Sequence, residues 1–178
     1  MNEDFDKLII AQAVKNSGNL EVAFKTHLLW QDILNRIVDD CFANLNSQLL
    51  ATLPTFGGYW TITPTKPANM RTAMNIQLSN SKWQNVVFGI GDYDGDRVHF
   101  FVRSQREDKK LLYEFVESHL NGHVIPDMWY QKADKPYNAW NSTLEGVKAV
   151  YQSKQFIDYS TSRIAKLATC INEYLNPA

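Results

Sequence analysis

The chain has 178 residues and a formal net charge of −1, which places it in the size range of one ordinary domain. Its hydrophobic content of 44% and charged content of 21% are typical of a globular protein and exclude a disordered chain. The small net charge excludes a strong overall field toward nucleic acid or an anionic membrane, so any such binding must be local. One domain over residues 1–178 is expected.

The N-terminal region, residues 1–52, is predicted to be helical. Apolar residues recur at helical spacing over residues 5–13, and Ser17-Gly18-Asn19 is typical of a helix end followed by a new cap. A second apolar stripe over residues 19–50 predicts a long helix. Roughly 30 residues at about 1.5 Å each span about 45 Å, so part of this helix is expected to contact a partner. The alternative is a kink or break within residues 44–47.

Residues 54–103 change to the two-residue period of β-strands, which predicts an antiparallel four-stranded meander sheet. Together with the helices on either side, this makes an α+β fold. The alternative is a five-stranded sheet, with the fifth strand in the loop formed by residues 124–141. Four runs have the strand pattern: 60–62, 72–78, 83–93 and 96–103.

The last two of these runs flank Asp94-Gly95, a pair suited to a type I′ hairpin turn. That turn would pair Ile90 with His99 and Phe88 with Phe101. Both faces of the hairpin are largely apolar. We therefore expect it near the middle of the sheet, with helices or loops over each face.

The C-terminal region, residues 104–178, is predicted to combine helices with an aromatic loop. Ser104-Gln105-Arg106-Glu107 has the pattern of a capping box that begins a helix, and Asn121-Gly122 would end it. Residues 124–141 are rich in aromatics and broken by proline, which predicts an ordered loop with one strand at most. A second capping box at residues 142–145 opens another helix, and a final helix is stopped by Pro177.

The cysteine pattern and the N-terminus favour a cytoplasmic protein. Cys41 and Cys170 both fall on apolar stripes of predicted helices, so we interpret them as reduced core thiols rather than a disulfide. The acidic start is unlike a secretory signal, and no apolar run approaches the roughly 18 residues of a membrane span.

Two acidic motifs suggest metal chemistry, but neither has the required spacing. Counted from Asp92, a calcium loop needs glycine at its sixth position and glutamate at its twelfth, where this chain has Arg97 and Arg103. Residues 107–109 match the Glu-x-Lys element of metal-dependent nucleases, but about ten strand residues at about 3.3 Å separate Glu107 from the hairpin acids. An acid elsewhere in the fold would be needed to complete such a site.

Neither the histidines nor the common catalytic motifs indicate a functional site in this sequence. His119 and His123 have helical spacing, but Asn121-Gly122 interrupts them, and no third ligand is apparent. His99 and His27 are interpreted as structural residues. Phosphate-loop, Gly-x-Ser-x-Gly and Cys-x-x-Cys patterns are absent. We therefore predict no catalytic residue, metal ligand or cofactor.

A locally basic, aromatic set of side chains is the remaining candidate for binding. Residues 53–106 carry six basic side chains against three acidic ones. Mixtures of this kind bind single-stranded nucleic acid, because cations neutralise phosphates and rings stack on bases. In the alternative interpretation, the loop aromatics seal the core. The set comprises Arg71, Lys82, Arg103, Arg106, Trp129, Tyr130, Lys132, Lys135 and Trp140.

From residue 20 onward the element order resembles the carboxyl-terminal module of some bacterial PD-(D/E)XK nuclease-superfamily proteins. The resemblance rests on that order and on the placement of aromatics: Trp60, Trp83, Phe88, Trp129 and Trp140. Where that family carries catalytic Asp and Glu-x-Lys residues in its nuclease core, this chain has no matching segment. The resemblance therefore implies an accessory or partner-binding half without the nuclease.

The favoured hypothesis is a non-enzymatic interaction domain that acts through protein contacts or self-association, made by the long helix and the aromatic loop. A homodimer or another protein is the expected partner, and no membrane is expected. The alternative is a nucleic-acid-binding or nuclease-related protein of a bacterial or phage system. A metal-dependent enzyme ranks third.

Overall fold

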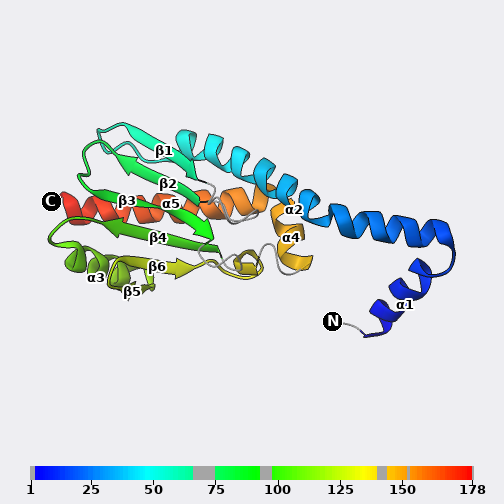
Figure 1. Ribbon diagram of the computed structural model, residues 1–178. Coiled ribbons are helices and arrows are strands. Elements are labelled where there is room, and N and C mark those ends of the chain that lie inside the picture. Colours follow the sequence, from blue (N-terminus) through cyan, green and yellow to red (C-terminus); the bar gives the residue numbers. More distant parts are fainter. Residues whose placement is uncertain (1–2, 66–74, 93–97, 140–143, 152, 178) are drawn as a thin grey trace. The chain divides into compact units, whose positions relative to one another are not determined.

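The computed structural model describes residues 3–65, 75–92, 98–139, 144–151 and 153–177 (Figure 1). The chain divides into two compact units, Met1–Arg36 and Ile37–Ala178. The helix α2, Ser17–Thr52, contributes its first half to the first unit and its second half to the second. It starts and ends two residues outside the predicted range and is helical through residues 44–47, so the alternative break does not occur.

The first unit consists of α1, Glu3–Ala13, and the first half of α2. The predicted short first helix is confirmed. Asn16 precedes α2 as its cap, because its side-chain oxygen accepts a hydrogen bond from the Asn19 backbone N–H at 2.8 Å. The Asn19 side chain in turn donates to the Gln12 carbonyl at 2.8 Å. This asparagine therefore joins the first turn of α2 to the last turn of α1.

The second unit is built on a six-stranded antiparallel sheet of order β1-β2-β3-β4-β6-β5. The predicted meander is present as its first four strands, but the prediction of four or five strands is too low. The segment predicted to hold at most one strand forms two, because the short hairpin of β5 and β6 extends the sheet beyond β4. The strands are β1 Trp60–Thr65, β2 Asn75–Asn80, β3 Val86–Asp92, β4 Val98–Ser104, β5 His123–Ile125 and β6 Met128–Lys132.

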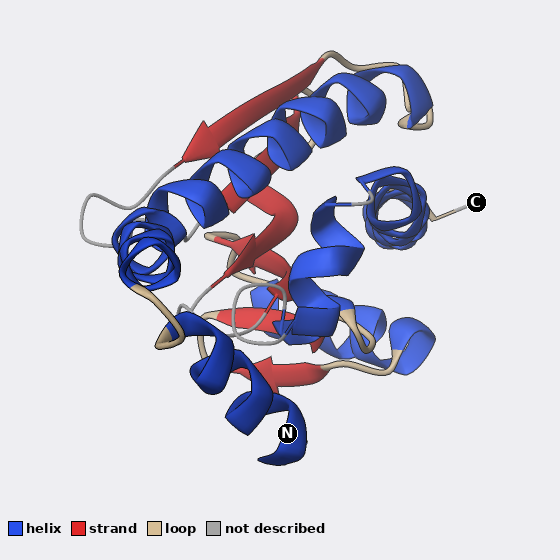
Figure 2. Cartoon of the chain, turned by 90° about the vertical axis from the view of Figure 1, so that its right-hand side faces the viewer, coloured by secondary structure: helices blue, strands red, loops and turns tan. Residues whose placement is uncertain are grey.

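The described helices of the second unit lie against one face of the sheet (Figure 2). The strands, the second half of α2 and the three later helices share one buried core. Phe42 and Leu45 of α2 pack there with Phe88 of β3, Trp129 of β6 and Phe156 of α5. The later helices are α3 Lys109–Leu120, α4 Leu144–Tyr151 and α5 Ser153–Leu175, with a 3₁₀ turn at Tyr137–Ala139. The final helix ends two residues before Pro177, as predicted.

The pairing of β3 with β4 differs from the predicted register by one residue. The structure places Phe88 opposite Val102, whereas the predicted turn placed it opposite Phe101. A shift of one residue turns every side chain of a strand to the opposite face. Val102 therefore joins Phe88 in the core, and Phe101 lies on the other face. The central position of the hairpin is confirmed, while the Asp94-Gly95 turn lies outside the described residues.

The start of α3 also differs from the prediction. Ser104 is the last residue of β4, and its hydroxyl accepts a hydrogen bond from the Arg106 N–H at 3.1 Å. The helix begins at Lys109, after Asp108, which makes no side-chain cap. The capping-box prediction for Ser104 and Glu107 is therefore wrong: the serine forms a local turn at the strand end instead. The left-handed conformation of Asn121 at the end of α3 confirms the predicted stop.

Candidate functional site

The face of the sheet opposite the core helices carries polar and aromatic side chains. Strand pairing aligns Gln77, Gly89, Phe101, Tyr130 and His123 in one row across five strands. At Gly89 any Cβ would overlap the carbonyl oxygen of Ile76 on β2, so this position requires glycine. The row therefore has a gap in its side chains over β3.

A cavity of about 520 Å³ opens at one end of this face. That volume is within the usual range for small-molecule sites, roughly 300–1,000 Å³. Its lining comes from β2, the β2–β3 turn, β3, β4, the β4–α3 segment, the start of α3 and the β5–β6 turn. The described lining residues are Gln77, Asn85, Val87, Arg103, Ser104, Gln105, Lys109 and Asp127.

Three charged side chains line the cavity, two of them cationic. The Arg103 guanidinium carbon lies 5.4 Å from the centroid of the Phe101 ring, the next residue on the same face of β4. Lys109 Nζ lies 3.3 Å from Asp127 Oδ1, and both side chains are exposed. An exposed pair of this kind contributes little stability, so Lys109 can exchange the carboxylate for another anion.

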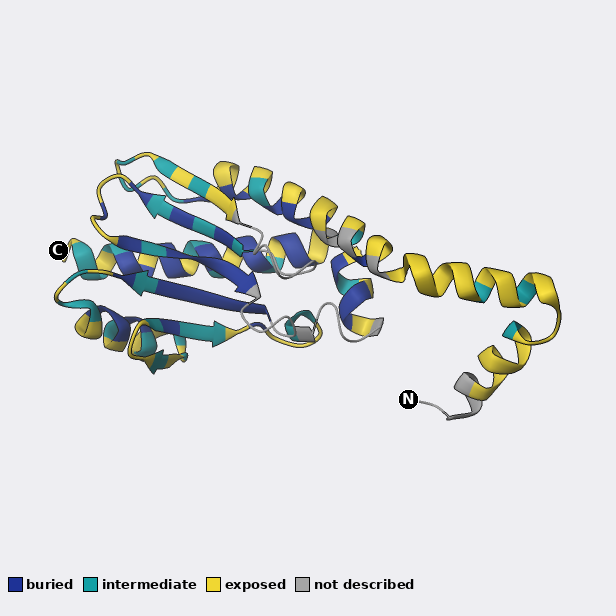
Figure 3. Cartoon of the chain, viewed as in Figure 1, coloured by how far each residue is buried: buried dark blue, intermediate teal, exposed yellow. Residues whose placement is uncertain are grey.

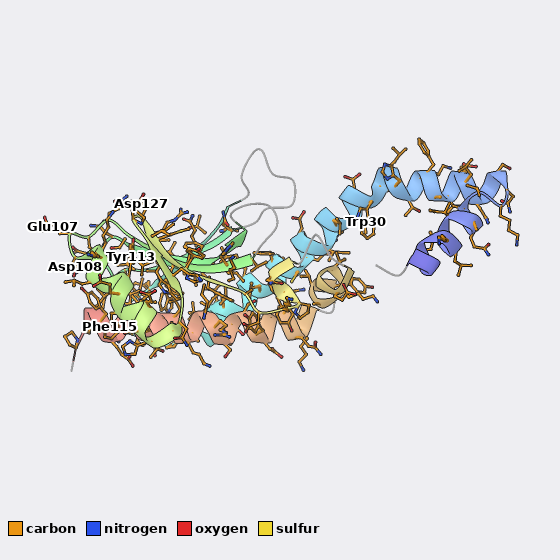
Figure 4. The ribbon with its side chains drawn as sticks, turned by 90° about the horizontal axis from the view of Figure 1, so that it is seen from below. Trp30, Glu107, Asp108, Tyr113, Phe115 and Asp127 are labelled. Atoms are coloured by element: carbon orange, nitrogen blue, oxygen red, sulfur yellow. The ribbon has the colours of Figure 1, made fainter. Side chains whose placement is uncertain are left out.

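The Tyr113 hydroxyl joins two walls of the cavity. Tyr113 and Asp127 are labelled in Figure 4. The hydroxyl accepts a hydrogen bond from the Ser104 N–H at 2.8 Å and donates one to the Asp127 carbonyl at 3.1 Å. A buried side chain of α3 thereby fixes both the end of β4 and the β5–β6 turn. Burial raises the pKa of Tyr113, while the Ser104 hydrogen bond and the nearby cations Lys109 and Arg103 oppose that shift.

A second, smaller cavity of about 340 Å³ lies beside the β4–α3 segment and includes Arg106 and Asp108 in its lining. The Arg106 guanidinium donates two hydrogen bonds to the Asp108 carboxylate, at 2.7 and 2.9 Å. Tyr174 of α5 donates a third at 3.1 Å. The hydrogen bond from Arg106, followed by that from Tyr174, lowers the pKa of Asp108. This site is a satisfied ion pair that fastens the segment to α5.

The structure distributes the predicted basic residues over several places. Arg103 lines the larger cavity, Arg106 is paired with Asp108, and Lys82 is exposed at the turn between β2 and β3. Lys132 is exposed at the far end of β6, opposite His99 rather than near Arg103. Arg71 lies outside the described residues. These cations therefore do not form one continuous surface.

The predicted aromatic residues also have different environments. Trp129 is fully buried in the core, which fits the alternative interpretation that loop aromatics seal it. Tyr130 is half-buried on the opposite face, with its ring centroid 5.4 Å from those of His99 and His123. Trp140 lies outside the described residues. Of the two predicted aromatics that the structure describes, Tyr130 is the one on the same side of the sheet as Arg103.

Sequence reasoning missed Lys109, Asp127 and Tyr113 as members of a site. Lys109 and Asp127 are far apart in sequence, and they meet only because the unpredicted β5–β6 hairpin folds back beside α3. Residues 107–109 match a nuclease element in sequence, yet it is Asp127 that contacts the lysine. Within the described ranges, no group of three or more His, Cys, Asp or Glu side chains is arranged to hold a metal ion.

Both cysteines are free and buried, as predicted. Burial raises the pKa of Cys41 to about 12 and that of Cys170 to about 11. Such thiols stay protonated at neutral pH and are poor nucleophiles. They therefore contribute packing rather than chemistry.

No protein-family model, curated protein or solved structure matches the chain. The resemblance to a nuclease-associated module accordingly stays a prediction. None of the described helices combines the length and the apolar character needed to cross a membrane.

Proposed function

We propose that this chain is an interaction protein that self-associates through its first unit. The supporting observation is the exposure of large hydrophobic side chains on α1 and the first half of α2, drawn mostly in yellow in Figure 3. Each of them is 40–65% exposed. They are Leu8, Ile9, Ile10, Val14, Leu20, Val22, Phe24, Leu28, Leu29, Trp30 and Ile33.

The concentration of this apolar surface supports a binding role. Scattered exposed hydrophobics are normal, but a dense group of them marks an interaction surface. The described part of the second unit is far longer yet has only five comparable side chains: Leu50, Tyr59, Leu111, Ile125 and Tyr151.

The spacing along α2 favours a helical partner. Leu20, Phe24 and Leu28 are four residues apart, so they lie on the same face of the helix. An apolar stripe of this kind is buried most simply by a second helix that carries a similar stripe.

A second copy of the chain is the partner that the charges favour. Residues 3–36 contain five acidic side chains and four basic ones. This near balance means that two copies would repel each other little. Both signs occur along each helix, so opposite charges could also meet across a symmetric pair.

Light scattering coupled to size-exclusion chromatography would test this proposal. We expect a mass of about twice the 20.5 kDa chain, with dissociation on dilution from roughly 100 to 1 µM. The substitution Leu28→Glu should shift the protein to monomer. Leu111→Glu is the matched control, because both leucines are 59% exposed. A wild-type chain that is monomeric throughout this range would contradict self-association.

The nucleic-acid alternative has weaker support. Arg106 is engaged by Asp108, Trp129 is buried, and Lys132 lies away from Arg103. A binding titration with single-stranded and double-stranded oligonucleotides at two salt concentrations would assess it, since phosphate contacts weaken steeply with salt.

A further inference from the structure

We propose that the 520 Å³ cavity on the sheet face opposite the described core helices binds a small molecule carrying a phosphate group. This site is separate from the apolar surface of the first unit and does not rest on self-association. It combines a concave shape, two cationic side chains and several neutral hydrogen-bond donors.

The cations make the cavity suited to an anion. Arg103 and Lys109 line it from β4 and α3, and Asp127 is its one acidic side chain among the described residues. The Phe101 ring under Arg103 restricts the guanidinium, so less conformational entropy is lost when it binds a ligand. Lys109 can leave its exposed contact with Asp127 and turn to a more highly charged group.

The neutral donors favour a phosphate over a carboxylate. Gln77, Asn85 and Gln105, whose side chains are amides, line the same cavity. A phosphate monoester carries a charge of about −1.5 to −2 and three acceptor oxygens, whereas a carboxylate has one charge and two oxygens. An arginine fork, an ammonium and several amides match the larger number of acceptors.

The distribution of charge favours a small ligand over a polynucleotide. A nucleic-acid strand needs a track of cations beyond the cavity. Lys132 lies opposite His99, four residues from Arg103 along the strand, which is about 13 Å at about 3.3 Å per residue. Arg106 is already bound to Asp108. Neither Lys132 nor Arg106 therefore extends the two cations of the cavity into such a track.

Isothermal titration of the full chain at low salt would test the proposal. The probes are pyrophosphate, a nucleoside monophosphate, citrate and a short oligothymidylate. We expect pyrophosphate and the nucleoside monophosphate to bind at one site, citrate to bind more weakly, and the oligonucleotide to gain nothing from its extra length. Arg103→Gln and Lys109→Gln should each weaken phosphate binding about tenfold, the typical effect of losing a charged hydrogen bond.

Two further variants distinguish binding in the cavity from nonspecific attraction of the anion to nearby cations. Lys110→Gln removes the neighbouring cation, which pairs with Glu114 and does not line the cavity, so binding should change less than about twofold. Asp127→Asn removes the competing acid, whose side chain is 91% exposed, and should tighten binding roughly threefold.

Several outcomes would overturn the proposal. One is the absence of phosphate binding at millimolar concentration, and another is equal weakening by Lys110→Gln and Lys109→Gln. Tighter binding of citrate would overturn the phosphate assignment, and affinity that rises with oligonucleotide length would overturn the small-ligand assignment. Thermal melts of every variant identify losses that arise from unfolding.

Discussion

The two units of this chain use the same residue types in opposite ways. In the first unit Phe24 is 61% exposed on α2, while in the second unit Phe88 is completely buried between the sheet and its helices. Hydrophobic side chains therefore contribute to the stability of the second unit but leave the first unit with unburied apolar surface. The comparison teaches that one apolar periodicity in sequence can indicate either a core or an interface.

The largest expected difference in the free energy of unfolding is between alanine variants of these two phenylalanines. Phe88→Ala should lower the free energy of unfolding by about 3–5 kcal/mol, because it leaves a cavity in a closed core. Phe24→Ala should change it by no more than about 0.5 kcal/mol in the monomer. Urea denaturation followed by tryptophan fluorescence measures both. A large loss for Phe24→Ala at low protein concentration would break the distinction between the units.

Two glycines provide the next comparison. Gly89→Ala should destabilise the second unit by about 2–3 kcal/mol, because the new methyl group overlaps the Ile76 carbonyl. Gly18, at the start of α2, has room for a methyl group, and alanine there should stabilise the helix by up to about 1 kcal/mol. Thermal melts by circular dichroism would show opposite shifts. Equal shifts in melting temperature would mean that the backbones of β2 and β3 are not in close contact at Gly89.

The smallest expected effect concerns two ion pairs. Asp108→Asn should cost about 1 kcal/mol at neutral pH, because the paired side chains are only about one third exposed. Glu21→Gln breaks the more exposed pair with Lys25 on α2 and should cost less than about 0.5 kcal/mol.

The pH dependence of the Asp108 pair follows from its lowered pKa. The folded state holds the carboxylate ionised more strongly than the unfolded state, so the pair stabilises the fold above the ordinary carboxyl pKa of about 4. That contribution is lost as the pH falls through the lowered value. The difference between the wild type and Asp108→Asn in urea denaturation should therefore shrink from pH 7 toward about pH 3. A constant difference would show that packing rather than charge is responsible.

Much of the architecture could be predicted from periodicity. The helix boundaries near Ser17, Asn121 and Leu175 follow from local signals for caps and stops, and the meander follows from two-residue alternation. Local signals failed where tertiary packing decides the outcome. The pair Ser104 and Glu107 has the letters of a capping box, yet the helix begins only after Asp108.

Most residues of the candidate cavity could not be predicted from the sequence. The sequence predicts Arg103 as a binding residue, but most of its partners in the cavity come from other segments of the chain. The contact between Lys109 and Asp127 depends on the β5–β6 hairpin, whose three- and five-residue strands are too short to show a clear pattern. The register of β3 and β4 was set by which side chains could enter the core, and the turn pattern alone predicted it wrongly.

The continuity of α2 has an evolutionary consequence. From Cys41 onward, its buried residues can change only together with the sheet and helices that pack on them. From Leu20 to Ile33, the exposed residues would instead be constrained by the second copy of the chain, if the proposed self-association holds. Under that proposal, one 36-residue helix should accumulate substitutions under two separate constraints: packing within the molecule for its second half, and contact with the second copy for its first half.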